Sequence, residues 1–86
     1  MAFKYIIVES KGNEVARIGS KLEDHRRLRR DFEKVISGGF VSINAFHMIR
    51  QNRGHFFCYG ESVGLKVKSR GKEDAALIQK LYEFDV

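Results

Sequence analysis

The sequence contains no proline and no tryptophan, and its single cysteine is Cys58. The absence of proline excludes a rigid polyproline linker and a ligand segment for SH3-type domains. One cysteine cannot form an intramolecular disulfide, so the core must hold the fold together, as in a reducing compartment. No apolar run approaches the roughly 18 residues that a membrane span needs, and the opening segment is charged too soon for a signal peptide. These absences predict a cytoplasmic protein with no membrane partner.

A chain of 86 residues predicts one domain over positions 1–86. Hydrophobic residues make up 43% of it, including seven Phe and three Tyr, which is enough material for a core. Lysine and arginine number 16 against 11 aspartates and glutamates, a formal net charge of +5. This balance favours acidic partners, such as nucleic acid or an acidic protein, but it does not choose between them.

The first half of the chain predicts a hairpin and then a helix. Residues 3–9 are rich in β-branched and aromatic side chains, 11–13 have turn chemistry, and 15–18 form a short return strand. Segment 21–36 has a helical period, and Gly38-Gly39 can end that helix. Its apolar stripe consists of Leu22, His25, Leu28, Phe32, Val35 and Ile36.

The second half predicts three strands and a helix. Residues 40–46 alternate, and 52–54 form a hairpin loop. Residues 55–59 are apolar on both faces, which predicts a central strand, and 63–68 alternate as a strand near an edge. A final helix is expected over 72–83.

This order, ββαβββα, predicts an α+β fold with an antiparallel sheet of about five strands and two helices on one face. Two helices lying across one small sheet should leave no cleft deep enough for chemistry. We therefore expect the protein to act through its surface.

Residues 60–64 match the G-x-S-x-G pattern of a hydrolase nucleophile, with Ser62 as the serine. That motif requires a strand before it and a helix directly after it. Here the following residues alternate like a strand, so we interpret the match as a turn. The sequence accordingly predicts no enzyme and no cofactor.

Four residues are of metal-ligating types, but their spacing does not match a zinc pattern. They are His25, His47, His55 and Cys58. His25 falls on the buried face of the predicted first helix, where one hydrogen bond would satisfy it. Cys58 lies in the most apolar strand, where cysteine usually acts as a small hydrophobic residue. We expect no metal site.

The basic run 25–30 is the sharpest charge feature of the chain. Arginine can hold a phosphate with two parallel hydrogen bonds. The same helix also carries acids, so that Glu23 can pair with Arg27, and Arg29 with Glu33. Two interpretations stay open: a solvated, salt-bridged face, or a contact with nucleic acid or an acidic protein. The candidate contact residues are Arg26, Arg27, Arg30, Lys34 and Arg53.

The tail from Tyr59 to Ile78 resembles the ends of short phage and prophage proteins of unknown function. Those proteins also open with a strand similar to Lys4–Glu9 and contain a glycine-rich segment similar to residues 38–41. The arginine-rich segment departs from that pattern. The resemblance implies no catalytic residues. Within the tail, Ser69 can cap the last helix, Asp74 suits its positive end, and Arg70 can reach a carboxylate; these three roles are structural.

The sequence thus predicts a small non-enzymatic binding module, a phage or prophage accessory protein acting by contact with a host or phage protein, for example as an inhibitor of a host system. The alternative is a nucleic-acid-binding module that uses the basic first helix. An open sheet edge would also suit a homodimer.

Overall fold

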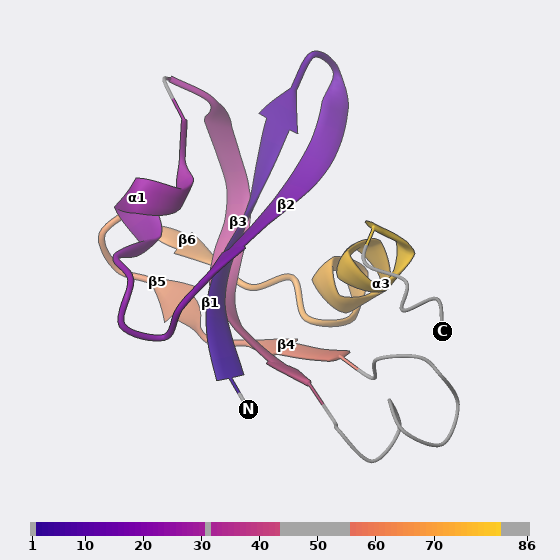
Figure 1. Cartoon of the computed structure of the whole chain (residues 1–86). Coiled ribbons are helices and arrows are strands. Elements are labelled where there is room, and N and C mark those ends of the chain that lie inside the picture. The colour runs from indigo at the N-terminus through magenta and orange to yellow at the C-terminus, as the bar shows by residue number, and fades with distance from the viewer. Residues whose placement is uncertain (1, 31, 44–55, 82–86) are drawn as a thin grey trace.

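The computed structural model describes residues 2–30, 32–43 and 56–81 (Figure 1). Its strands and helices, in chain order, are β1 (Ala2–Ser10), β2 (Asn13–Gly19), α1 (His25–Leu28), β3 (Lys34–Ile43), β4 (Phe56–Tyr59), β5 (Glu61–Ser62), β6 (Val67–Lys68) and α3 (Lys72–Leu81). Neither helix in these ranges is long and apolar enough to cross a membrane.

The strands form two antiparallel sheets. The larger has the order β2-β1-β3-β4, and the smaller pairs β5 with β6. This arrangement confirms the α+β class, but it replaces the single five-stranded sheet that the sequence predicts. The predicted hairpin is present, since β1 pairs with β2 from Lys4↔Gly19 to Ser10↔Asn13.

Strand β1 is the centre of the fold, because four consecutive side chains, Tyr5 to Val8, are fully buried. Successive strand residues point to opposite faces. Tyr5 and Ile7 pack with Ile78 of α3. Ile6 lies on the other face, where the Cγ2 atoms of Ile6 and Val67 both come close to Gly38. The larger sheet is therefore covered on both sides.

The two helices lie on opposite faces of this sheet, which corrects the prediction that both cover one face (Figure 1). Lys4 is paired with Phe40 across β1 and β3, and the ring of His25 in α1 meets the ring of Phe40 edge-on. Tyr5, the next residue of β1, hydrogen-bonds instead to Asp74 of α3.

The predicted helix over 21–36 is wrong. Only one turn, His25–Leu28, is helical, and it starts at Asp24, whose side chain accepts a hydrogen bond from the backbone N–H of Arg26. Leu22 and Phe32, two members of the expected apolar stripe, are 95% and 98% exposed. The end of that segment belongs to β3 instead.

Gly38 and Gly39 lie inside β3 and do not end a helix. A Cβ atom on Gly39 would overlap the backbone carbonyl oxygen of Tyr59. The backbone at the end of β4 and in the β4–β5 connection thus lies so close to Gly39 of β3 that only glycine fits at this position.

The predictions for the last strands are partly wrong. Strand β4 is the last strand of the larger sheet and not a central one. The segment 63–68 is mostly a turn, and only Val67–Lys68 is a strand. The expected loop at 52–54 and the end of the 40–46 strand lie outside the described residues.

Helix α3 confirms the predicted helix from Lys72 to Leu81, while positions 82 and 83 of that prediction lie outside the described residues. The helix is anchored by a buried carboxylate. Asp74 is fully buried and accepts four hydrogen bonds. Two come from hydroxyls, Tyr5 at 2.6 Å and Ser37 at 2.9 Å. Two come from Arg70, through its backbone N–H at 2.9 Å and its Nε at 2.8 Å. Ser69 accepts from the N–H of Gly71, the residue before the first helical one, so it closes the turn that leads into α3 and does not cap a helical N–H. The predicted roles of Asp74 and Arg70 are present.

This core should make the protein sensitive to alkali. Burial raises the pKa of Cys58 from 9.0 to about 11, and burial and the hydrogen bond to Asp74 raise the pKa of Tyr5. Because the folded state holds both groups neutral, the contribution of Cys58 to stability is complete below about pH 9 and is lost as the pH rises toward about 11, whereas the contribution of Tyr5 begins to be lost only above its ordinary pKa of 10.0. Urea unfolding followed by circular dichroism should show a falling midpoint across this window. In a Cys58→Ala variant the loss should be smaller, and an unchanged midpoint in the wild type would contradict the prediction.

Candidate functional site

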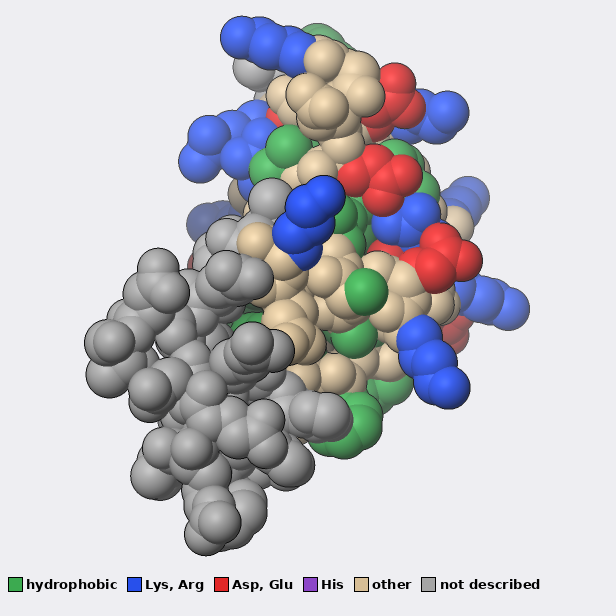
Figure 2. Space-filling view, turned by 90° about the vertical axis from the view of Figure 1, so that its right-hand side faces the viewer, with side chains coloured by type: hydrophobic (Ala, Val, Ile, Leu, Met, Phe, Trp, Pro, Cys, Tyr) green, Lys and Arg blue, Asp and Glu red, His purple; other side chains and the backbone are tan. Residues whose placement is uncertain are grey.

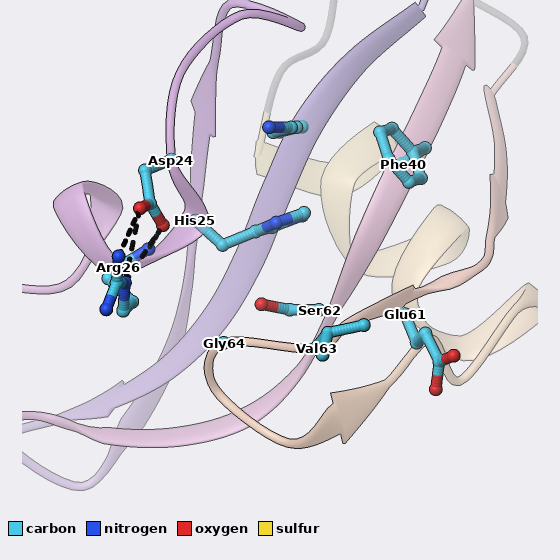
Figure 3. Close-up of a pocket in the computed structure, with 9 residues that line it drawn as sticks. Asp24, His25, Arg26, Phe40, Glu61, Ser62, Val63 and Gly64 are labelled. Atoms are coloured by element: carbon cyan, nitrogen blue, oxygen red, sulfur yellow. Dashed lines mark hydrogen bonds and ion pairs between the residues drawn. The ribbon is translucent and has the colours of Figure 1, made fainter.

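An open pocket of about 500 Å³ lies between α1, the larger sheet and the turn that follows β5 (Figure 3). Its lining residues are Lys4, Asp24, His25, Arg26, Phe40, Glu61, Ser62, Val63 and Gly64. The sequence predicts no cleft deep enough for chemistry, and the pocket that is present is open to solvent. It also brings a histidine and the serine of the G-x-S-x-G match to one place.

His25 is held by the sheet. Its side chain is 7% exposed, and its Nε2 lies 2.7 Å from the carbonyl oxygen of Gly39. Because a carbonyl oxygen only accepts, Nε2 must carry the hydrogen, which leaves Nδ1 as the ring's acceptor. The predicted role of His25 as a buried residue satisfied by one hydrogen bond is therefore confirmed.

Ser62 is 2% exposed and belongs to the short β5–β6 ladder, paired with Val67. Its Oγ accepts a hydrogen bond from the backbone N–H of Leu65 at 3.4 Å, which closes the turn after β5. A strand and not a helix follows that turn, so the structural context of a nucleophile elbow is missing.

Figure 3 shows the side chains of His25 and Ser62 entering the pocket from α1 and β5. The two side chains are not hydrogen-bonded to each other in the described part of the chain. His25 bonds to the carbonyl oxygen of Gly39, and Ser62 accepts from the N–H of Leu65. An activated serine requires a base within hydrogen-bond reach of its hydroxyl. The geometry thus gives Ser62 a role in the turn.

One ion pair stands at the mouth of the pocket. The guanidinium of Arg26 donates to the carboxylate of Asp24 through Nε and Nη2, the latter at 2.8 Å. These hydrogen bonds lower the pKa of Asp24 from 3.8 to about 2 and raise the pKa of Arg26. Because both side chains are well exposed, water screens the pair, and it adds little to stability. The ion pair with Asp24 nevertheless engages the guanidinium of Arg26, which is one of the candidate contact residues predicted from the sequence.

Two apolar side chains, Phe40 and Val63, line this pocket, and Val63 is 80% exposed. The ring of Tyr59 stacks on that of Phe40 with centroids 5.8 Å apart, and Tyr59 is 48% exposed. Phe57, on the same face of β4 as Tyr59, is 54% exposed. We call Phe40, Tyr59 and Val63 the apolar rim.

The other predicted contact residues do not gather at this pocket. Arg27 and Arg30 line a second cavity with β2, and Lys34 is exposed at the start of β3. Arg53, His47 and His55 lie outside the described residues. The predicted pair Glu23–Arg27 is present at 3.9 Å, whereas Glu33 pairs with Arg17 and not with Arg29.

On the face that carries α3, the described residues form no patch of only positive or only negative side chains. Figure 2 shows Lys and Arg side chains interspersed with Asp and Glu on that face. Within the part of the chain that the structure describes, no group of three His, Cys, Asp or Glu residues is placed to hold a metal ion.

The apolar rim is the feature that sequence reasoning missed. Its signal is visible in 55–59, which is apolar on both faces. That pattern predicts a central strand, whereas within the described residues α3 packs against Phe56 on one face of β4, and Phe57 and Tyr59 on the other face are about half exposed.

The chain matches no protein-family model, and it matches neither a curated protein nor a solved structure. The resemblance to phage proteins therefore stays a prediction from the sequence.

Proposed function

We propose that this chain is a non-enzymatic binding module that acts by protein–protein contact through the apolar rim and the pocket behind it. One observation carries the proposal: Val63 lines the pocket and is 80% exposed, and Tyr59, which is 48% exposed, stacks on Phe40 in the lining of the same pocket. Apolar surface of this kind, ringed by polar side chains, is typical of an interaction site.

The chemistry of the surface fits a protein partner better than a polyanion. Its charged groups are of both signs, with Lys4 and the Asp24–Arg26 pair on one side and Glu61 on the other. Aromatic residues and arginine are enriched at protein interfaces, and a polar rim around an apolar centre is their usual pattern. The accessory role in a phage or prophage, and inhibition of a host system, rest on the sequence resemblance alone.

The test compares partners recovered from the producing cells by three forms of the tagged chain. A Tyr59→Ser/Val63→Ser variant removes the two exposed side chains of the rim, keeps Phe40, and changes no residue of the buried core. We expect one specific partner to bind the wild type and to be lost with this variant, at a cost of about 2 kcal/mol or more for a central aromatic residue.

The matched control is an Arg27→Gln/Arg30→Gln variant, which changes two exposed residues on the far side of α1. It should retain the partner. Loss of the same partner with the control, retention with the rim variant, or ester hydrolysis that Ser62→Ala abolishes would contradict the proposal. Sedimentation of the purified protein shows whether the recovered partner is a second copy of the chain.

A further inference from the structure

Three arginines surround a second, smaller cavity between α1 and β2. Its volume is about 250 Å³, and the residues that line it are Ala16, Arg17, Ile18, Arg27, Leu28 and Arg30. None of these lining residues is acidic. The cavity is therefore a cationic site, separate from the pocket with the apolar rim.

The positive charge of this cavity is only partly neutralised. The Nη2 of Arg17 donates to Glu33 at 2.6 Å, which lowers the pKa of Glu33, and the second oxygen of that carboxylate accepts from the backbone N–H of Arg30. Glu33 is thus occupied by two donors. Arg27 reaches Glu23 only at 3.9 Å. Among the ion pairs of the described residues, none involves the Arg30 guanidinium.

Arg17 is fixed beside the cavity. Its Nε has almost no accessible surface and has no hydrogen-bond acceptor in the described part of the chain, so the ligand contacts fall to Arg27 and Arg30. The Arg17–Glu33 pair is itself largely covered, with side chains 17% and 14% exposed, so the guanidinium is held in place.

We propose that this cavity binds the phosphate group of a small phosphate monoester. The phosphate dianion would accept hydrogen bonds from Arg27 and Arg30, because each guanidinium group can donate two parallel hydrogen bonds to phosphate oxygens. It would also neutralise the positive charge of the cavity that the carboxylate of Glu33 does not neutralise. The size agrees with this assignment, because a pocket for a drug-sized ligand is roughly 300–1,000 Å³ and this cavity is smaller. The proposal does not depend on the protein-contact function.

The test follows the arginine Nε–Hε signals of the ¹⁵N-labelled protein by NMR. Inorganic phosphate and glycerol 2-phosphate are added at constant ionic strength, with sodium chloride and glycerol as controls. Saturable shifts of the Arg27 and Arg30 signals with both phosphates, and none with the controls, are the expected result. Arg30→Gln should weaken binding about tenfold, the effect of losing one charge-assisted contact.

Arg29→Gln is the matched control, because Arg29 follows α1, is exposed and does not line the cavity. It changes net charge as Arg30→Gln does, and it should leave the affinity unchanged. Equal weakening by both variants would show unspecific charge attraction and overturn the proposal, as would shifts that do not saturate. A short DNA duplex that shifts these signals while inorganic phosphate does not would overturn it as well.

Discussion

An Asp74→Asn variant should lose about 3–5 kcal/mol of its free energy of unfolding, the cost of breaking a buried charged hydrogen-bond network by changing one partner. The carboxylate is fully buried and accepts from Tyr5, Ser37 and Arg70. Asparagine offers one oxygen in place of two, and its NH₂ group would face donors. Since small domains have net stabilities of about 5–15 kcal/mol, a loss of this size leaves little of the folded state.

Urea unfolding followed by circular dichroism measures this loss. Glu73→Gln is the matched control, because Glu73 precedes Asp74 on the same helix, is 74% exposed and contacts Arg70 only at 3.6 Å. It should change stability by less than about 1 kcal/mol. Tyr5→Phe should fall between the two, since it removes one donor and leaves the carboxylate three others. Equal losses for Asp74→Asn and Glu73→Gln would refute the role given to the buried carboxylate.

Gly39→Ala should produce the second largest loss, about 1–3 kcal/mol or more for inserting a methyl group into a closed space. The added Cβ would overlap the carbonyl oxygen of Tyr59 and lie 3.1 Å from the backbone of Gly60. Backbone cannot rotate away as a flexible side chain can, so β3 or the β4–β5 connection must shift. The same movement would displace the oxygen to which His25 bonds.

Gly64→Ala is the control for this prediction. The three atoms nearest to a Cβ at Gly64 all belong to the flexible side chain of Arg26, at 3.4–3.5 Å. Its thermal midpoint should stay close to that of the wild type, whereas that of Gly39→Ala should fall by several degrees for each kcal/mol lost. If Gly39→Ala melts like Gly64→Ala, the close crossing over β3 is not a constraint on the fold.

The sequence predicted the elements whose buried faces carry large apolar side chains. The first hairpin and α3 are of this kind. The second half of β3 was also predicted, since residues 40–43 belong to the strand expected over 40–46. The first half was not, because small residues occupy its buried positions: Ser37 bonds to Asp74, and Gly39 faces the backbone of Tyr59. The sequence of this segment therefore lacks the alternation of apolar and polar residues that predicts a strand.

The apolar residues of segment 21–36 have helical spacing by coincidence. Val35 and Ile36 completed a stripe that began at Leu22, but pairing with β1 outweighs such a local pattern. The error passed on to the candidate site, because a long helix would display the arginines on one continuous face. With a single turn, Arg26 points to one pocket while Arg27 and Arg30 line another.

The bond between Tyr5 and Asp74 joins residues 69 positions apart. Strand β1 therefore leaves the ribosome before β3 and long before α3, the two elements that bury it. During that interval its run of four apolar side chains has only β2 as a neighbour, and such a strand invites association with other chains. Synthesis in the cell should thus be the stage at which this protein most needs a chaperone.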